Sequence, residues 1–288
     1  MNSAFLSSNG TSSNGISSNG AVAQAAGSRW QGFYLYPGGA IDPFLADQFF
    51  PFISSEREAG RLRRFFFLRH QEGGMHLRLR LQPTPGAEEA LIAGLEQCAA
   101  VWTSSELVKS YYDRTEHYFG ETPASVYSEL LNESTSWLTL RLLRSIGTAP
   151  QQRMHRWLTL TSALDFFLRR STHNDAERRR ALQEGYDFSC RAAVDWGHTL
   201  DNVKEDGGFG IEAAASVEKS RPRVAAALAE DQEALRIAAL LRRLRHNVPK
   251  GSQIAVHALH LFCNKFGFHL GEEHAAMVAL LHLDTART

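Results

Sequence analysis

Residues 65–81, FFFLRHQEGGMHLRLRL, carry the clearest secondary-structure pattern of this chain. The glycine pair Gly73-Gly74 separates two runs of apolar and aromatic residues, a pattern typical of a β-hairpin. In the second run, apolar and basic residues alternate: Met75, Leu77, Leu79 and Leu81 against His76, Arg78 and Arg80. Successive side chains of a strand point to opposite faces. One face can therefore cover a core, and the alternation predicts that the basic face is exposed to solvent.

The segments around this hairpin predict an antiparallel sheet covered by helices. The aromatic run WQGFYLY, residues 30–36, precedes a Pro-Gly-Gly turn and is typical of another strand. Asp42 before Pro43 is expected to cap a helix, which Pro51 interrupts. Residues 87–102 have the apolar spacing of an amphipathic helix. Strand, helix, hairpin and helix in this order favour a layered α+β fold over a parallel one.

The second half of the chain is expected to be largely helical. Residues 123–171 and 174–246 are rich in Ala, Leu, Glu and Arg, and residues 251–283 have the pattern of two helices. A break is expected near residues 147–150, and the glycines of residues 207–210 are expected to form a loop between helices. The predicted class is α+β, with an antiparallel sheet in the N-terminal half packed with helices and a largely helical C-terminal half.

The beginning of the chain differs from the rest. Residues 1–28 contain SSNGTSSNGISSNG and a run of small residues, which offer too little apolar surface to offset the entropy of ordering them. We therefore expect a disordered Ser/Asn/Gly-rich tail at residues 1–28 and a single folded domain at residues 29–288. A chain of 288 residues is long enough to bury one substantial core.

Composition and charge argue against several classes of partner. The 31 Lys and Arg balance the 31 Asp and Glu, so no overall field attracts nucleic acid or an anionic membrane. The arginine runs at residues 178–180 and 242–245 are expected to be solvated helix faces. No apolar run reaches the roughly 20 residues of a membrane span. The N-terminus lacks the basic-then-apolar order of a signal peptide.

The three cysteines, Cys98, Cys190 and Cys263, are far apart in sequence and show no CxxC spacing. This arrangement suggests neither a disulfide framework nor a zinc ribbon. Buried free thiols in a reducing compartment are the expected state. We therefore expect a cytoplasmic protein.

Two further segments carry candidate site residues. His257, His260 and Asn264 stand at i, i+3 and i+7, so they share one face of a helix and can line a cleft. A histidine on such a helix often has only a structural role. A second polar cluster comprises Tyr112, Asp113, Arg114, Glu116, His117 and Tyr118. Guanidinium groups bind carboxylates and stabilise oxyanions, and a histidine moves protons near neutral pH. Together with the arginines of the hairpin, these groups suit a lyase or cyclase acting on a peptide.

Metal catalysis is the competing chemistry, because His257 and His260 could ligate zinc. No HExxH pattern or cysteine pair completes that set, and Asn264 is a poor zinc ligand. The sequence also has neither a P-loop nor a GxGxxG that follows a strand. We therefore expect an enzyme that uses no cofactor and no metal.

Three segments in order resemble the C-terminal domain of lantibiotic dehydratases, a family with free-standing members in thiopeptide pathways. They are the HLRLR hairpin, the segment from Tyr112-Asp113-Arg114 to Gly120, and the late HLFCNK helix at residues 260–265. The resemblance covers nearly everything from Trp30 to the end of the chain. It implies that residues 29–288 form one domain of this kind. In the dehydratase branch, this domain removes glutamate from glutamylated Ser or Thr side chains.

The resemblance also implies roles for single residues. The dehydratase branch uses an arginine on the HLRLR strand, an arginine before the glycine of the second segment, and a histidine on the late helix. Arg80 or Arg78 matches the first and His260 matches the third. Tyr118 stands where the second arginine is expected. Further departures are Gly120-Glu121 in place of Gly-Gly and Asn264-Lys265 in place of Asn-Arg.

A second branch of the resembled family comprises macrocyclases, which join two dehydroalanines in a formal aza-[4+2] cycloaddition that yields a pyridine ring. They need groups that polarise an amide carbonyl and move protons, but no glutamate clamp. Because Tyr118 replaces an arginine, we expect this activity. Glutamate elimination by a split dehydratase and non-catalytic peptide binding are the alternatives.

The expected site residues and partners follow from this choice. The predicted catalytic residues are His260, Tyr118 and Arg80. The predicted substrate-binding residues are Arg78, His76, Tyr112, Arg114, His117, His257 and Asn264. The expected partner is a precursor peptide with a leader segment, together with other modification enzymes of the same pathway.

Overall fold

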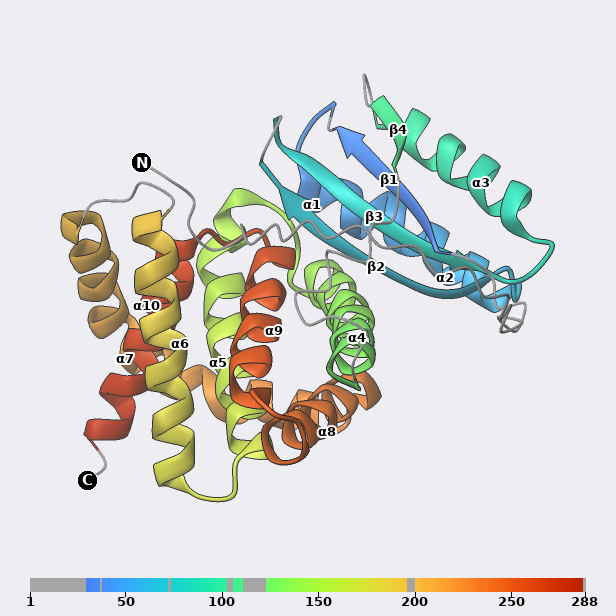
Figure 1. Ribbon diagram of the computed structural model, residues 1–288. Helices are drawn as coiled ribbons and strands as arrows, with labels where there is room; N and C mark the ends of the chain where they lie inside the picture. Colours follow the sequence, from blue (N-terminus) through green and yellow to red (C-terminus); the bar gives the residue numbers. More distant parts are fainter. Residues whose placement is uncertain are drawn as a thin grey trace, which may run out of the picture.

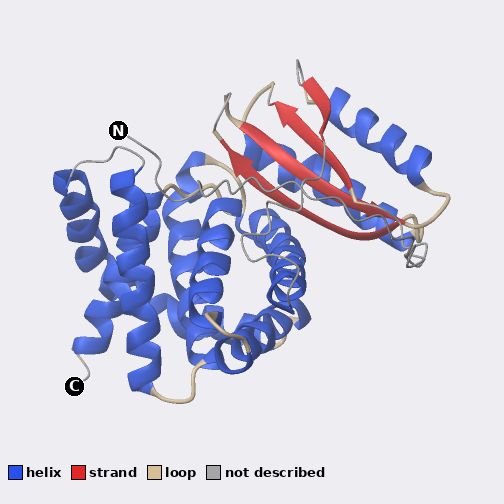
Figure 2. Ribbon diagram, viewed as in Figure 1, coloured by secondary structure: helices blue, strands red, loops and turns tan. Residues whose placement is uncertain are grey.

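The computed structural model describes residues 30–36, 38–71, 74–102, 106–110, 123–195 and 200–286. The tail expected at residues 1–28 lies outside this part of the chain. A four-stranded antiparallel sheet forms the N-terminal part, and helices form most of the rest (Figure 1; Figure 2). The α+β class predicted from the sequence is confirmed.

The sheet has the strand order β2-β3-β1-β4, and every neighbouring pair is antiparallel. The strands are β1 Gln31–Tyr36, β2 Leu62–His70, β3 His76–Pro83 and β4 Glu106–Ser110. β2 and β3 form the predicted hairpin, with His70 opposite His76. Gly74 in the turn has φ +102°, a conformation that favours glycine.

One face of the sheet covers the main core, as the alternation predicts. Leu77, Leu79 and Leu81 are each 0% exposed. Phe67 and Phe65 of β2 lie opposite Leu79 and Leu81 and are also buried. Each such side chain contributes about 1.5–3 kcal/mol through the removal of apolar surface from water. Met75 was predicted on this face, but it is 42% exposed because it lies in the turn before β3.

The helical segment after β1 differs from its prediction. It comprises α1 Ile41–Phe44, a π-helical turn Leu45–Phe49 and α2 Phe50–Glu58. Asp42 lies in the first turn and does not cap the helix, because its carboxylate instead binds Arg69 of β2 at 2.5 Å. Pro51 does not interrupt the segment. It lies in the first turn of α2, just after the π-helical turn, where a missing N–H is tolerated.

The other helices follow the predicted order with one difference. They are α3 Glu88–Ala100, α4 Pro123–Ile146, α5 Arg153–Ser171, α6 Asp175–Asp195, α7 Leu200–Ala229, α8 Gln232–Asn247, α9 Gly251–Lys265 and α10 Leu270–Thr285. The break predicted near residues 147–150 separates α4 from a short 3-10 turn, Pro150–Gln152. The predicted break between the last two helices is also confirmed.

The difference concerns the glycines at residues 207–210, which lie inside α7 and not in a loop. α7 packs along α10. A Cβ atom at Gly210 would lie 2.3 Å from the backbone oxygen of Ala275. The glycine therefore permits close approach of two helices, a use that its sequence pattern does not distinguish from a turn.

The helical part contacts the sheet at the outer edge of β2. Such an edge presents backbone N–H and C=O groups that need partners. Ser136 Oγ of α4 accepts a hydrogen bond from the N–H of Phe67 at 3.2 Å. Asn264 of α9 accepts one from the N–H of Arg69 at 2.9 Å and donates one to its carbonyl oxygen at 3.0 Å. Two helices thus continue the hydrogen bonding of the sheet with their side chains.

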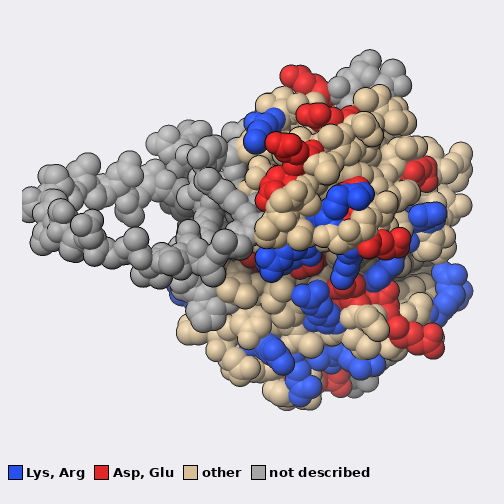
Figure 3. Space-filling view, turned by 90° about the vertical axis from the view of Figure 1, so that its right-hand side faces the viewer, with Lys and Arg blue, Asp and Glu red and all other residues tan. Residues whose placement is uncertain are grey.

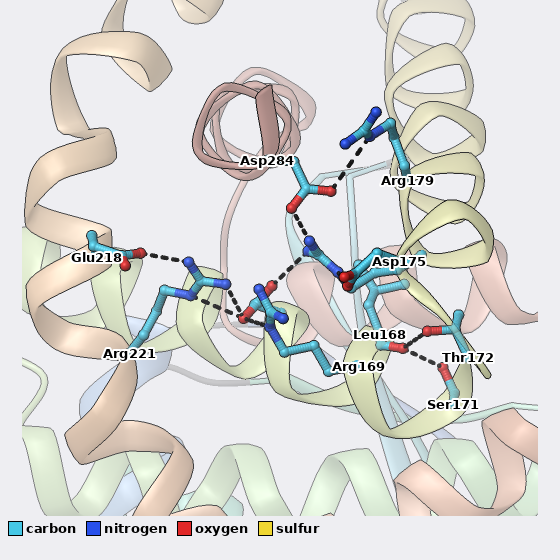
Figure 4. A network of polar contacts seen from close by, with 11 residues as sticks. Leu168, Arg169, Ser171, Thr172, Asp175, Arg179, Glu218, Arg221 and Asp284 are labelled. Atoms are coloured by element: carbon cyan, nitrogen blue, oxygen red, sulfur yellow. Dashed lines mark hydrogen bonds and ion pairs between the residues drawn. The ribbon is translucent and has the colours of Figure 1, made fainter. Parts of the chain in front are cut away.

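A buried ionic network joins α5, α6, α7 and α10 (Figure 4). The carboxylate of Asp165 accepts from Arg221 at 2.6 and 2.9 Å, from Arg169 at 2.8 Å and from Arg178 at 3.1 Å. Arg178 also binds Asp284 of α10. The sequence predicted a solvated face for Arg178, but its side chain is 4% exposed because this face of α6 turns toward α10.

The surface carries charges of both signs. On the face in Figure 3, acidic and basic side chains are interspersed, in keeping with the formal net charge of zero. Within the described ranges, no helix combines the length and the apolar character required to span a membrane.

The pairing of Asn264 with the sheet edge leads to a stability prediction. Asn264→Ala removes both hydrogen bonds and leaves the N–H of Arg69 without its acceptor, so the free energy of unfolding should fall by about 2–3 kcal/mol. Urea unfolding measures the difference. Gln253→Ala, which removes an exposed amide from the same helix, should change it by less than about 0.5 kcal/mol. Equal losses in the two variants would contradict the role of Asn264.

Candidate functional site

β3 places its two arginines beside Tyr34 of β1. In the register, Tyr34 lies opposite Arg78, and Gly32 lies opposite Arg80. The guanidinium carbons of Arg78 and Arg80 lie 5.4 and 5.7 Å from the centre of the Tyr34 ring, within cation–π range. Arg80 is 0% exposed, and its Nη1 donates to the carbonyl oxygen of Leu79 at 3.0 Å. The basic face predicted to be solvated is therefore largely buried.

His76 lies among aromatic rings at the start of β3 and is 2% exposed. Its ring centre lies 5.0 Å from that of Tyr34, 4.9 Å from that of Tyr36 and 5.3 Å from that of His70. Its Nδ1 lies 2.8 Å from the carbonyl oxygen of Gly74. The hairpin turn thus orients this imidazole, and its role in substrate binding stays a prediction.

His260 of α9 forms a hydrogen-bonded pair with Glu273 of α10. Its Nδ1 lies 2.7 Å from Oε2 of Glu273, whose side chain is 3% exposed. Burial lowers the pKa of His260, but the charge of Glu273 and this hydrogen bond outweigh burial and raise the pKa above its ordinary value. Because Nδ1 is bound to the carboxylate, Nε2 is the nitrogen suited to exchange a proton with a substrate.

His257 lies one turn before His260, and its pKa is shifted in the opposite direction. The two ring centres are 5.9 Å apart, and Phe188 of α6 packs against both rings. Burial, together with the positive charges of His260 and Lys265, lowers the pKa of His257 to about 3. His257 is therefore neutral near pH 7, whereas the pKa of His260 is shifted in the opposite direction, toward its charged form. Adjacent groups with separated pKa values are typical of acid–base sites.

Lys265 is a third residue of α9 with a shifted pKa. The sequence indicated it only as a departure from the Asn-Arg pair of the resembled family. It is fully buried, and its Nζ donates to Oδ1 of Asn132 on α4 at 2.8 Å. Burial lowers the pKa of Lys265 to about 7. A lysine that titrates near neutral pH can act as an acid or a base. Helical spacing alone did not select Lys265 or Glu273, because burial and partners on other helices define their chemistry.

One residue of the predicted site face of α9, Asn264, has a structural role because it holds the helix against β2. The amide of Asn264 binds the backbone of Arg69 through both its oxygen and its nitrogen. Substrate binding by Asn264 stays a prediction, as it does for His257.

Other predicted site residues fall outside the described residues: Tyr112, Arg114, His117 and Tyr118. The catalytic roles predicted for Arg80, Tyr118 and His260 also stay predictions. Within the described part of the chain, α9 contacts the outer edge of β2, and β3 pairs with its inner edge. The helix with the histidines and the strand with the arginines are thus neighbours of the same strand.

The cysteines are free thiols, as the sequence predicts. Burial raises the pKa of Cys98 to about 12 and the pKa of Cys263 well above its ordinary value. Both thiols are therefore protonated at neutral pH and are poor nucleophiles.

The two helical histidines do not form a three-ligand group with any other described residue. Among the described residues, the group of potential metal ligands that does occur is His173, Glu177 and His246. A metal ion at His257 and His260 would therefore lack a third ligand from this part of the chain.

Residues 30–283 match the family described as Lantibiotic biosynthesis dehydratase C-term, and the chain belongs to this family of enzymes that modify ribosomally made peptides. None of the curated protein sequences matches the chain. The family assignment agrees with the resemblance seen in the hairpin and in the late helix.

Three solved structures share the fold. The tRNA dependent lantibiotic dehydratase MibB from Microbispora sp. 107891 is 19% identical with a TM-score of 0.61, over 95% of this chain and 29% of that chain. The pyridine synthase TbtD from thiomuracin biosynthesis is 16% identical with a TM-score of 0.57, over 90% of this chain and 97% of that one. TsrL is 13% identical with a TM-score of 0.59, over 90% and 95%. This chain thus spans less than a third of MibB and nearly the whole of the other two.

The lowered pKa of Lys265 makes stability depend on pH. The unfolded chain keeps the lysine proton up to about pH 10.5, whereas the folded protein releases it near pH 7, so the free energy of unfolding should rise between these values. Lys265→Met removes the buried charge and should raise Tm at pH 7 by several degrees. The difference in Tm between Lys265→Met and the unmodified protein should decrease toward pH 10, as measured by thermal unfolding.

A matched control is Lys219→Met, which replaces an exposed lysine of α7. Its Tm should follow that of the unmodified protein at every pH. A constant difference between Lys265→Met and the unmodified protein from pH 6 to 10 would contradict a lowered pKa.

Proposed function

We propose that this protein catalyses a formal aza-[4+2] cycloaddition between two dehydroalanines of a precursor peptide, which forms a pyridine ring. The observation that carries the proposal is the His260–Glu273 pair, in which a buried carboxylate favours the charged imidazole. A charged imidazole can donate a proton to an amide oxygen and take one up later. His260 is the proposed general acid and base, and Glu273 is the residue that positions it.

The reaction requires few catalytic groups from the protein. The amide beside one dehydroalanine has to move a proton from nitrogen to oxygen before it can react as the four-atom component. Two carbon–carbon bonds then form between this component and the double bond of the other dehydroalanine. Loss of water and release of the leader peptide as its amide then give the aromatic pyridine ring. The protein has to hold the two dehydroalanines together, polarise the amide carbonyl and relay protons. The pKa of His260 is raised by Glu273, and the pKa of Lys265, one and a half turns along α9, is lowered by burial to about 7, so both groups are proposed to take part in the relay.

The substrate and the other partners follow from this activity. The precursor peptide binds through its leader segment, and Arg78 and Arg80 hold carbonyl oxygens of the core peptide. Other modification enzymes of the pathway supply the dehydroalanines. The reaction takes place in the cytoplasm, where a ribosomal peptide is made.

The similarity to known structures supports a cyclase. The fold of the pyridine synthase TbtD corresponds to this chain over 97% of its length. Fold alone does not fix the reaction. The proposal therefore depends on the acid–base pair of α9 and α10, with Tyr118 as the predicted second proton donor.

Glutamate elimination is the second candidate, and the two arginines of β3 favour it. A guanidinium pair on one strand face can hold a glutamate carboxylate. The histidine would then remove the α-proton while glutamate leaves. Non-catalytic binding of the precursor peptide is the third candidate.

Two substrates separate these candidates. One is a leader-bearing peptide with two dehydroalanines, and the other carries a glutamylated serine. We expect the first to lose water and release its leader peptide, as followed by mass spectrometry. Loss of glutamic acid from the second would instead favour elimination. Binding of both peptides without a change in mass would favour the non-catalytic role.

The role of His260 can be tested by substitution. His260→Ala should lower kcat by about 10²- to 10⁴-fold, as expected for loss of a general acid or base. Tyr118→Phe should also lower kcat. Both should weaken peptide binding much less, because groups that act in the transition state mainly affect turnover.

The role of Glu273 can be tested by the pH profile. In Glu273→Gln the carboxylate charge is absent, so burial becomes the largest influence on His260. The pKa of His260 should then fall below its ordinary value. If charged His260 is the acid, activity declines as pH rises through its pKa, so in Glu273→Gln the decline should begin at lower pH. Glu272→Gln removes the neighbouring carboxylate, which binds Arg153, and should keep the original profile. A profile unchanged in Glu273→Gln would exclude the pair as the acid.

A further inference from the structure

A polar cavity lies at the opposite end of α9 from Lys265. It has a volume of about 470 Å³ and is formed by the α5–α6 connection, the first turns of α6, the last turn of α8 and the start of α9. Its lining includes His173, Glu177, Glu184, Arg245, His246 and Ser252. Ser252 and His260 are eight residues apart on α9, or about 12 Å along the helix axis. The cavity is therefore separate from the proposed acid–base pair.

Three side chains of this cavity bring potential metal ligands together. The donor atoms of His173, Glu177 and His246 all lie within 4.8 Å of one another. Nε2 of His246 lies 3.5 Å from Oε1 of Glu177. The rings of His173 and His246 are tilted by 35° with centres 4.0 Å apart. Ligands of a tetrahedral zinc ion stand about 3.3 Å apart, since each lies about 2.0–2.1 Å from the metal.

The backbone already holds one ligand in place. The second carboxylate oxygen of Glu177, Oε2, accepts a hydrogen bond from the N–H of His173 at 2.7 Å. This bond leaves Oε1 on the side of His246. His173 is exposed, so its ring can rotate to close the distance to a metal ion. The ligand set, two imidazoles and a carboxylate, is one that zinc and related divalent ions prefer.

Arg245 provides an independent indication of a ligand. Its side chain is 3% exposed and lines the cavity. Its Nη1 lies 3.9 Å from Glu184, too far for a hydrogen bond, and its Nε and Nη2 have no hydrogen-bond partner among the described residues. A buried guanidinium normally has its N–H groups satisfied. Two adjacent N–H groups match the two oxygens of a carboxylate or another oxyanion.

We propose that His173, Glu177 and His246 bind a divalent metal ion of the zinc class, and that Arg245 binds a small oxyanion that completes its coordination. The carboxylates of Glu177 and Glu184 disfavour an anion in this cavity by itself, whereas a metal ion reverses that repulsion. Three protein ligands beside a cavity leave a coordination position for an exogenous group. The ion would also join the α5–α6 connection to the end of α8. The sequence did not predict this site, because His246 is far from His173 and Glu177 along the chain.

Metal titration of the full-length chain, without a polyhistidine tag and after treatment with a chelator, tests the proposal. Calorimetry with Zn²⁺ and visible absorption with Co²⁺ should each show saturable binding of one ion per chain. His246→Ala and Glu177→Gln should each weaken binding at least tenfold. His155→Ala is the matched control, because His155 lies in the first turn of α5 and binds Arg223. It should bind metal like the unmodified protein.

The oxyanion is tested in the same experiment. Acetate should change the Co²⁺ spectrum of the unmodified protein, and it should have no such effect in Arg245→Met, whose folding is checked by its Tm. If Arg245→Met does not fold, the response of the Co²⁺ spectrum of the unmodified protein to acetate shows whether an oxyanion binds beside the metal. Absence of one-to-one metal binding, or equal binding by His246→Ala, would overturn the metal site. Acetate binding without metal would assign the cavity to an anion alone.

Discussion

The backbone groups at the outer edge of β2 determine how the helical part is placed against the sheet. An edge strand carries backbone groups that have to find partners. Here the partners are the side chains of Ser136 and Asn264, from two helices that are far apart in sequence. These bonds fix the helical part against the sheet. They also fix α9, so that His260, one turn before Asn264, has a defined position relative to the strand with the arginines.

The chemistry of α9 comes from the helices packed around it. Glu273 of α10 favours the charged form of His260, Phe188 of α6 covers both histidines, and Asn132 of α4 binds Lys265. The pKa values of three titratable groups on one helix are thus shifted by different causes: burial lowers those of His257 and Lys265, whereas Glu273 raises that of His260. The network around Asp165 ties α5, α6, α7 and α10 together, so the position of Glu273 depends on the packing of the whole bundle.

The differences between the predicted and the observed structure share one cause. Arg178 and Arg80 were assigned to solvated faces, yet both are buried beside partners from other elements. The glycines at residues 207–210 have the pattern of a loop, but Gly210 lets α7 approach α10. Asp42 has the pattern of a helix cap, but it binds Arg69 of β2. In each case a contact distant in sequence overrides a local preference.

The hairpin, the antiparallel sheet and the order of the helices can be predicted from the sequence, because alternation and helical spacing are local consequences of backbone geometry. Helical spacing also places His257 and His260 on one face of a helix. Helix packing, in contrast, pairs His260 with Glu273, buries Lys265, and brings His173, Glu177 and His246 together. The pKa of a side chain and its set of neighbours depend on burial and on charges from other segments. Neither quantity is encoded in the spacing of residues along one helix.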